Sequence, residues 1–253
     1  MAAAVVGTVV SAILTGWFQE AAPDLSRRAL GSPALEVRFA ADISDQTAPF
    51  ALQKPVTTPQ DRAMLVEPTS SREWQNFIRE KNAAPVDRAD MQIVLEGGRS
   101  KIRIVDLRPR ILHKSTRWGG AYFIPATAGE VEAISVSADL DHPDPHFTQG
   151  KKGSRNYFHE KQLELARGEQ VTLTISVTAK AAAYEFDFVA TVIADGKIHD
   201  VPIRLPGKKP FLITARQAKP SGYSQVFKEQ GEAWVQAPAA GRVWCKVVGD
   251  EKC

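Results

Sequence analysis

The segment from Asp139 to His146 holds the densest group of residues that could do chemistry. It contains three aspartates, two histidines and two prolines in the order DLDHPDPH. In an extended chain His142, Asp144 and His146 point to one side, and imidazole with carboxylate is a donor set for zinc or another divalent cation. The prolines equally favour a stiff connector whose Asp and His side chains are solvated. We expect the connector, and a metal site at these three residues is the alternative.

Motifs of catalytic nucleophiles and of phosphate-binding loops are missing from the sequence. It contains no G-x-S-x-G, no H-E-x-x-H and no Gly-rich phosphate loop. The whole sequence has five histidines, and two of them lie in the proline-containing connector, so few general bases are available. We therefore expect a protein that is not an enzyme and that needs no cofactor.

Two groups of aromatic residues could form a binding surface for a protein or a glycan. Trp118 and Tyr122 flank Gly119-Gly120, and Tyr157-Phe158-His159 follows a basic loop. Loops at the ends of a β-sandwich are common binding sites. The same rings could instead cap the open ends of the hydrophobic core, and this second interpretation is the one that we favour.

The composition describes a globular chain that can bury a core. The sequence has 253 residues, of which 43% are apolar and 24% are charged. Its formal net charge of +3 is close to neutral for this length and indicates no nucleic-acid partner.

Periodicity predicts that most of the chain is β-structure. Apolar residues alternate with polar ones over 171–178, and a second alternating run covers 184–192. Asp195-Gly196 predicts a tight hairpin turn after that run, and Gly97-Gly98 predicts a hairpin earlier in the chain. About seven such strands predict a two-sheet antiparallel β-sandwich, immunoglobulin-like in general architecture, over residues 85–216.

The remaining segments are assigned around this sandwich. Residues 21–69 are expected to hold one strand, around 35–39, and a proline-rich linker. A capping box at Ser70 and Glu73 predicts an amphipathic helix over 70–84 that packs on the sandwich. Residues 217–253 are expected to form a C-terminal hairpin or tail, in which 234–236 pairs with 243–248.

Residues 2–18, AAAVVGTVVSAILTGWF, carry no charged side chain and predict a transmembrane anchor over 1–20. The run lies at the short end of the roughly 20 residues that span a bilayer. A cleaved signal peptide is the competitor, but nothing basic precedes the apolar run apart from the amino terminus, and the cleavage pattern is poor. Arg27 and Arg28 follow the run, and the positive-inside rule would then keep the globular part in the cytoplasm.

The two cysteines, Cys245 and Cys253, lie at the end of the chain in a C-x7-C pattern. They could form a disulfide in an oxidising compartment, whereas in the cytosol they would be free thiols. With a membrane anchor at the other end of the chain, we expect the disulfide.

Several segments together resemble a group of uncharacterised actinobacterial single-span membrane proteins with a β-sandwich domain. The resemblance implies membrane association, a sandwich outside the cell and no established activity. It covers residues 1–215 and rests on Trp74-x-x-Phe77 and on 91–112, 134–141, 184–197 and 209–215.

These observations lead to one expected function and two alternatives. We expect a single-pass protein of the cell membrane whose extracytoplasmic sandwich is a non-catalytic interaction or sensing module. The alternatives are a structural or metal-binding envelope domain that uses 139–146, and an anchored domain that faces the cytoplasm.

Overall fold

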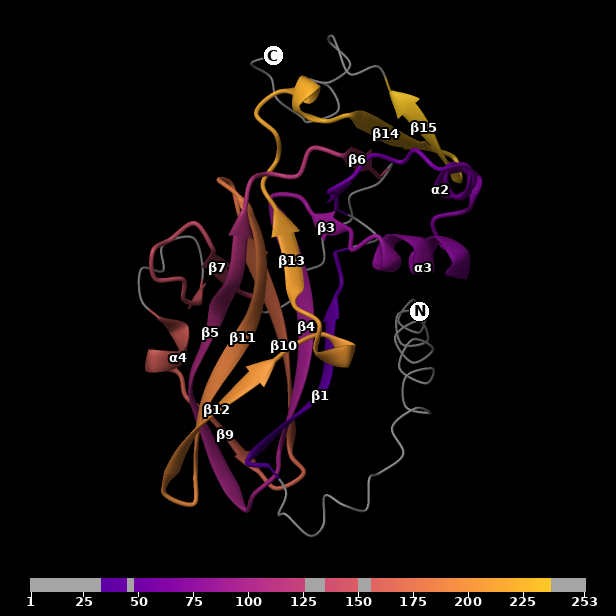
Figure 1. Ribbon diagram of the computed structural model, residues 1–253. Helices are drawn as coiled ribbons and strands as arrows, with labels where there is room; N and C mark the ends of the chain where they lie inside the picture. The colour runs from indigo at the N-terminus through magenta and orange to yellow at the C-terminus, as the bar shows by residue number, and fades with distance from the viewer. Residues whose placement is uncertain (1–32, 45–47, 126–134, 150–155, 238–253) are drawn as a thin grey trace, which may run out of the picture. The chain divides into compact units, whose positions relative to one another are not determined.

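The computed structural model describes residues 33–44, 48–125, 135–149 and 156–237, which form a mainly β protein with a few short helices (Figure 1). In chain order the elements are β1 (Leu35–Asp42), β2 (Phe50–Leu52), α2 (Pro59–Ala63), η2 (Met64–Val66), α3 (Arg72–Glu80), β3 (Ala84–Pro85), β4 (Arg88–Gly97), β5 (Lys101–Ser115), β6 (Ala121–Ile124), β7 (Ser135–Asp139), β8 (Thr148–Gln149), α4 (Tyr157–Glu160), β9 (Leu163–Ala166), β10 (Gln170–Thr178), β11 (Ala183–Ala194), β12 (Lys197–Ile203), η3 (Pro206–Lys208), β13 (Phe211–Thr214), η4 (Pro220–Gly222), β14 (Gln225–Gln230) and β15 (Ala233–Ala237).

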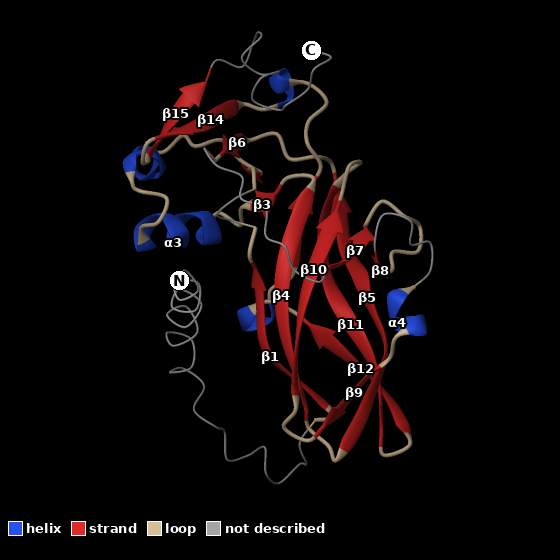
Figure 2. Cartoon of the chain, turned by 180° about the vertical axis from the view of Figure 1, so that it is seen from behind, coloured by secondary structure: helices blue, strands red, loops and turns tan. Residues whose placement is uncertain are grey.

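Two sheets pack face to face around the main core (Figure 2). The first sheet has the order β1-β4-β10-β7-β8, and the second has the order β12-β11-β5-β9, with β13 also paired to β11. Alternate residues of the long strands, such as Ile93 on β4 and Phe188 on β11, are fully buried between them. The predicted mainly β, sandwich-like architecture is therefore confirmed. The prediction of purely antiparallel sheets is wrong, because β7 pairs with β10 in parallel.

The two predicted hairpin turns have different outcomes. Asp195 (φ 50°) and Gly196 (φ 71°) connect the antiparallel strands β11 and β12, as predicted. Gly97-Gly98 does not form a hairpin, because β4 and β5 belong to different sheets. Both β4 and β5 bury an apolar face in the main core, so the connection at Gly97-Gly98 leads the chain from the first sheet to the second. A Cβ on Gly97 would lie 2.3 Å from the carbonyl oxygen of Ala166, so the chain passes too close there for any side chain.

A third sheet, with the order β15-β14-β6-β2-β3, was not predicted. It joins segments that are far apart in sequence, and β14 pairs in parallel with β6. Its core contains the stacked rings of Phe50, Phe123 and Phe227 and the indoles of Trp74 and Trp234. The expectation of a strand followed only by a proline-rich linker within 21–69 is therefore wrong, because β2 contributes buried residues to this core.

The predicted helix is present as α3, but it packs elsewhere. Its buried residues Trp74, Phe77 and Ile78 belong to the core of the third sheet, so the prediction that the helix lies on the sandwich is wrong. The helix also begins one residue later than the capping box indicates. Ser71 is the N-cap, and its Oγ accepts a hydrogen bond from the backbone N–H of Trp74 at 3.1 Å.

The strand around Trp234 has a partner other than the predicted one. β15 pairs antiparallel with β14, and Glu229 lies opposite Trp234. The predicted partner, 243–248, lies outside the described residues.

Segment 2–18, Arg27, Arg28, Cys245 and Cys253 also lie outside the described residues. Within the described part of the chain, none of the helices has the length and apolar character needed to cross a bilayer.

Asp87 links the sandwich to the third sheet. The bridge between Val86 and Thr214 brings the two parts together, and the backbone N–H of Asp87 donates to the carbonyl of Thr214 at 2.9 Å. The carboxylate of Asp87 accepts from the backbone N–H of Arg216 at 2.7 Å and lies 3.0 Å from its Nε. Asp87 has a left-handed backbone (φ 67°), which aspartate tolerates better than most residues.

Candidate functional site

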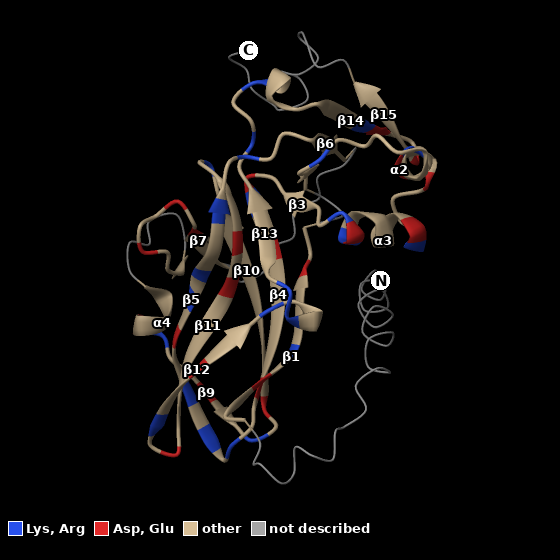
Figure 3. Ribbon diagram, viewed as in Figure 1, with Lys and Arg blue, Asp and Glu red and all other residues tan. Residues whose placement is uncertain are grey.

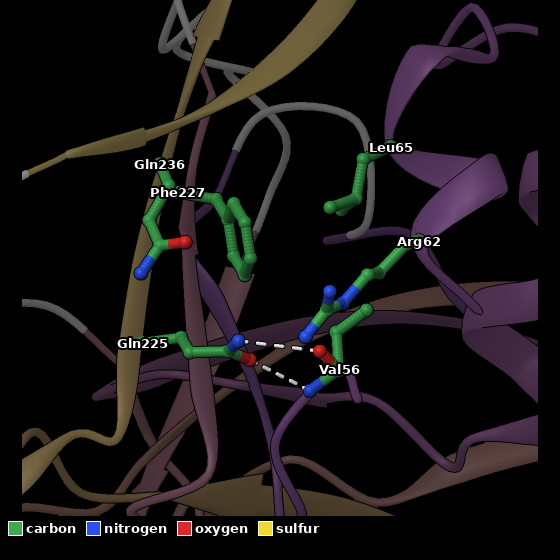
Figure 4. A pocket seen from close by; sticks show the side chains of 6 residues that line it. All are labelled: Val56, Arg62, Leu65, Gln225, Phe227 and Gln236. Atoms are coloured by element: carbon green, nitrogen blue, oxygen red, sulfur yellow. Dashed lines mark hydrogen bonds between the residues drawn. The ribbon is translucent and has the colours of Figure 1, made fainter. Parts of the chain in front are cut away.

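A pocket of about 250 Å³ lies between the α2–η2 segment and the β14–β15 hairpin (Figure 4). It brings together residues from two stretches of chain that are more than a hundred positions apart. The residues that line it are Val56, Arg62, Leu65, Gln225, Phe227 and Gln236.

The strand pairing places three of these side chains on one face of the third sheet. Gln225 and Phe227 are two positions apart on β14 and therefore point to the same side. Gln236 lies directly opposite Phe227 on β15. Phe227 is 2% exposed and stacks on Phe123, so the aromatic core fixes its ring at the pocket wall.

Short helical turns supply the opposite wall. Thr58 is the N-cap of α2, and its side chain accepts a hydrogen bond from the backbone N–H of Asp61 at 3.1 Å. The three-residue spacing of Arg62 and Leu65 then places both on the same side of the turn. The carboxylate of Asp61 forms an ion pair with Lys81 at 2.8 Å, which connects α2 to the segment after α3.

Gln225 fixes the base of the pocket, because its side-chain amide forms the two hydrogen bonds with Val56 that a neighbouring strand would form in a sheet. Its Oε1 accepts from the backbone N–H of Val56 at 2.7 Å, and its Nε2 donates to the carbonyl of Val56 at 3.2 Å. One side chain thus satisfies both backbone groups of a nearly buried residue. Val56 presents its side chain to the pocket as a result (Figure 4).

Arg62 gives the pocket its one distinctive charge. Its side chain extends from α2 toward Val56 and Gln225 (Figure 4). Among the described residues its guanidinium has no ion-pair or hydrogen-bond partner, because the neighbouring Asp61 is paired with Lys81. The pocket therefore combines the apolar side chains of Val56, Leu65 and Phe227 with a cation that can bind a carboxylate in a bidentate manner.

The predicted metal ligands do not form a metal site in the structure. The Nδ1 atoms of His142 and His146 lie 2.7 and 2.9 Å from the carbonyl oxygen of Asp144, and the two rings meet edge to face. The segment has a turn at 140–141 and bends at 142–144, so it is not the extended chain on which the prediction depends. Across the described residues, no group of three His, Cys, Asp or Glu side chains is close enough to hold a metal ion.

Asp141, which belongs to the same segment 139–146, binds the loop at residues 180–181 through its carboxylate. Its carboxylate accepts hydrogen bonds from the backbone N–H groups of Lys180 (2.5 Å) and Ala181 (3.0 Å) and from the hydroxyl of Tyr184 (2.5 Å). Burial works to raise the pKa of the Asp141 carboxyl, but these hydrogen bonds and the charge of Lys114 together lower it below its usual value. The connector is therefore a structural element of the sandwich end.

Of the residues considered for an aromatic binding surface, Tyr122 and Phe158 are buried, Trp118 and Tyr157 are partly buried, and His159 is exposed. Phe158 is 0% exposed and belongs to the main core, as the capping interpretation expects. Tyr122 is buried in the third sheet and stacks on Tyr223 with ring centroids 4.6 Å apart, and Trp118 packs beside them. Burial raises the pKa of the Tyr122 hydroxyl and raises the pKa of Tyr223 to about 12.

A buried ion cluster on the second sheet was also missed by the sequence analysis. The alternation over 184–192 places Asp187 on the polar, solvent-facing side of β11, yet its side chain is 0% exposed. Two arginines enclose it, with Arg110 Nη2 and Arg204 Nε each 2.7 Å from Oδ2. The hydrogen bond to Asp187 raises the pKa of Arg110. The Asp187 carboxylate is paired with both arginines, which stay 48% and 35% exposed, so the cluster holds its strands together rather than offering a reactive carboxylate.

No family model matches the chain, and no curated protein matches it.

Proposed function

We propose that the protein is a non-catalytic interaction module, held at a cell membrane by residues 2–18, and that it binds a partner protein through the pocket of the third sheet. The observation that carries this proposal is the guanidinium of Arg62, which has no ion-pair partner among the described residues and lies beside the apolar side chains of Leu65 and Phe227. A cation in that position favours an anionic ligand group, and the apolar walls favour a hydrocarbon side chain next to it.

The size of the pocket supports a protein partner over a glycan. A cavity of about 250 Å³ is smaller than the roughly 300–1,000 Å³ that is typical of sites for whole small molecules. It suits one aliphatic side chain with an adjacent carboxylate, which is the chemistry of a protein's C-terminal residue. Phe227 and Leu65 would contact the side chain, and Arg62 would bind the carboxylate.

An extracytoplasmic location is the second part of the proposal. The apolar segment 2–18, its poor cleavage pattern and the C-x7-C pair at the end of the chain support an exported, anchored protein. For the sandwich we propose an immunoglobulin-like general architecture, supported by two sheets of short strands over a common core.

An anchored domain that faces the cytoplasm is the competing proposal. Arg27 and Arg28 follow the apolar segment, and basic residues favour the cytoplasmic side. Alkylation of Cys245 and Cys253 in intact cells distinguishes the two locations. Labelling from outside only after reduction supports export, whereas free thiols that react only after lysis contradict it.

The binding proposal is tested by NMR titration of the full chain with N-acetyl-leucine. We expect millimolar binding, with chemical-shift changes at Leu65 and Phe227, and weaker binding of N-acetyl-leucinamide, which lacks the carboxylate. Replacing Leu65 with Trp should fill the cavity and abolish the shifts. Equal binding of acid and amide, or shifts that persist in Leu65→Trp, would refute the pocket as the site.

A further inference from the structure

Within the described part of the chain, one backbone edge of strand β5 has no strand partner along most of its length. It runs from Lys101 to Ser115 and pairs with β11 on one side throughout. On its other side β9 pairs only with residues 101–104. Among the described residues no strand pairs with 105–115 on that side, so their outward backbone groups have no ladder partner.

Helix α4 lies beside the first part of this edge, and no strand of the described ranges pairs with the rest. The Nδ2 of Asn156, at the start of α4, donates to Asp106 at 3.2 Å, and His159 lies 3.8 Å from the same carboxylate. Beyond them Ile111 and Leu112 are 38% and 43% exposed. Leu112 lies at a bulge, where the pairing with β11 shifts between Ile111 and His113. Unpaired backbone beside exposed apolar side chains is the usual basis of strand addition.

Basic residues outnumber acidic ones along the free part of β5. Residues 108–114 read RPRILHK, with three basic residues, one histidine and no carboxylate, and Lys and Arg recur along β5 in Figure 3. Arg108 is about half exposed, and its nearest carboxylate, Asp106, is 3.9 Å away. The charge of Arg110 is already compensated by Asp187. Two copies of β5 pairing edge to edge would bring like charges together, so the edge disfavours self-association.

We propose that the free edge of β5, residues 108–115, binds an extended acidic segment of a partner protein by strand addition. Side chains of an added strand alternate between the faces of the second sheet. Acidic residues on the outer face would lie beside Arg108, and apolar residues on the other face would cover Ile111. Pro109 has no N–H, so the hydrogen bonds of the added strand concentrate at Arg110–Ser115.

Fluorescence anisotropy of a labelled peptide of alternating glutamate and valine, titrated with the full chain, tests this inference. We expect saturable binding that a peptide of alternating lysine and valine does not show. An acidic peptide with N-methylated backbone amides keeps its charge but cannot form the ladder, and we expect it to bind about tenfold more weakly. Equal binding of the unmodified and the N-methylated acidic peptide would show that charge alone causes the binding, and it would overturn the proposal.

Protein variants locate the site and separate it from the pocket. Arg108→Glu should weaken peptide binding about tenfold, while Arg99→Glu, a reversal of similar exposure in the loop before β5, should leave it within about twofold. Leu65→Trp, which fills the pocket, should leave it unchanged. Loss of binding in Leu65→Trp but not in Arg108→Glu would overturn the assignment to β5. A concentration-dependent dimer that Arg108→Glu abolishes would identify a second copy as the occupant instead.

Discussion

Arg110 and Asp187 lie opposite each other on β5 and β11 and form a two-pronged ion pair in the middle of the second sheet. Arg110 Nε is 2.9 Å from Oδ1 of Asp187, and Nη2 is 2.7 Å from Oδ2. Arg204 adds a third contact to the same carboxylate at 2.7 Å. Asp187 is fully buried even though it points away from the main core, because the arginines cover it.

Replacing Asp187 with Ala should lower the free energy of unfolding by about 1.5 kcal/mol, because Arg110 and Arg204 lose their shared partner although both stay partly exposed to water. Urea denaturation of the variant measures this loss. Asp144→Ala, at an exposed aspartate outside the positive-φ positions, is the matched control and should change stability by less than about 0.5 kcal/mol. Similar effects of the two substitutions would show that the ion cluster contributes little.

Asp141 should make the protein sensitive to acid. Its folded-state pKa lies below the unfolded value, so its contribution is present above about pH 4 and is lost as the pH falls through the folded-state pKa. Asp141→Asn should be less stable at neutral pH and should show a shallower loss of stability in acid. Asp144→Asn, at an exposed neighbour, should retain the wild-type pH curve, and a shallower curve there would contradict the assignment to Asp141.

The buried tyrosines of the third sheet should limit stability in alkali. Burial raises the pKa of Tyr122 and raises that of Tyr223 to about 12, so the unfolded chain loses its phenolic protons first. Stability should therefore fall as the pH rises above about 10. Thermal denaturation between neutral and alkaline pH should show a flatter decline in Tyr122→Phe than in the wild type. An identical decline in both would contradict this cause.

Gly120 should tolerate no side chain, because a Cβ there would lie 2.4 Å from the carbonyl carbon of Lys54. We expect Gly120→Ala to lower the free energy of unfolding by about 3 kcal/mol, since backbone rather than a flexible side chain must move. Gly168→Ala has open space but a positive φ of 78°, and should cost only about 1 kcal/mol. Chemical denaturation measures the free energy of unfolding of both variants. A smaller loss of stability in Gly120→Ala than in Gly168→Ala would contradict the predicted clash with Lys54.

The sandwich was predictable where strands alternate between a buried and a solvated face. The alternation of 171–178 gave β10, and Asp195-Gly196 gave the turn between β11 and β12, because both signals are local. The same reasoning failed at Asp187. Alternation assigns a residue to a face of the sheet, but only the cross-strand partner, Arg110, decides whether that face is solvated.

The third sheet and its pocket could not be predicted from the sequence. β2 and β6 are three and four residues long and buried throughout, so they show no alternation. Their partners are distant, as in the pairing of β14 with β6. Gln225 reads in the sequence as an ordinary polar strand residue. Its role depends on Val56, which the fold brings to it from more than 160 positions away.

Reversing the charge at Arg62 tests the central claim most directly. In an NMR titration of the full chain, the wild type should bind N-acetyl-leucine in preference to isopentylamine, and Arg62→Glu should invert this preference because the apolar walls remain. Arg72→Glu, a charge reversal at an exposed position of α3 outside the pocket, should retain the wild-type preference. An unchanged preference in Arg62→Glu, or an equal change in Arg72→Glu, would contradict the pocket as a binding site for a carboxylate next to an apolar side chain.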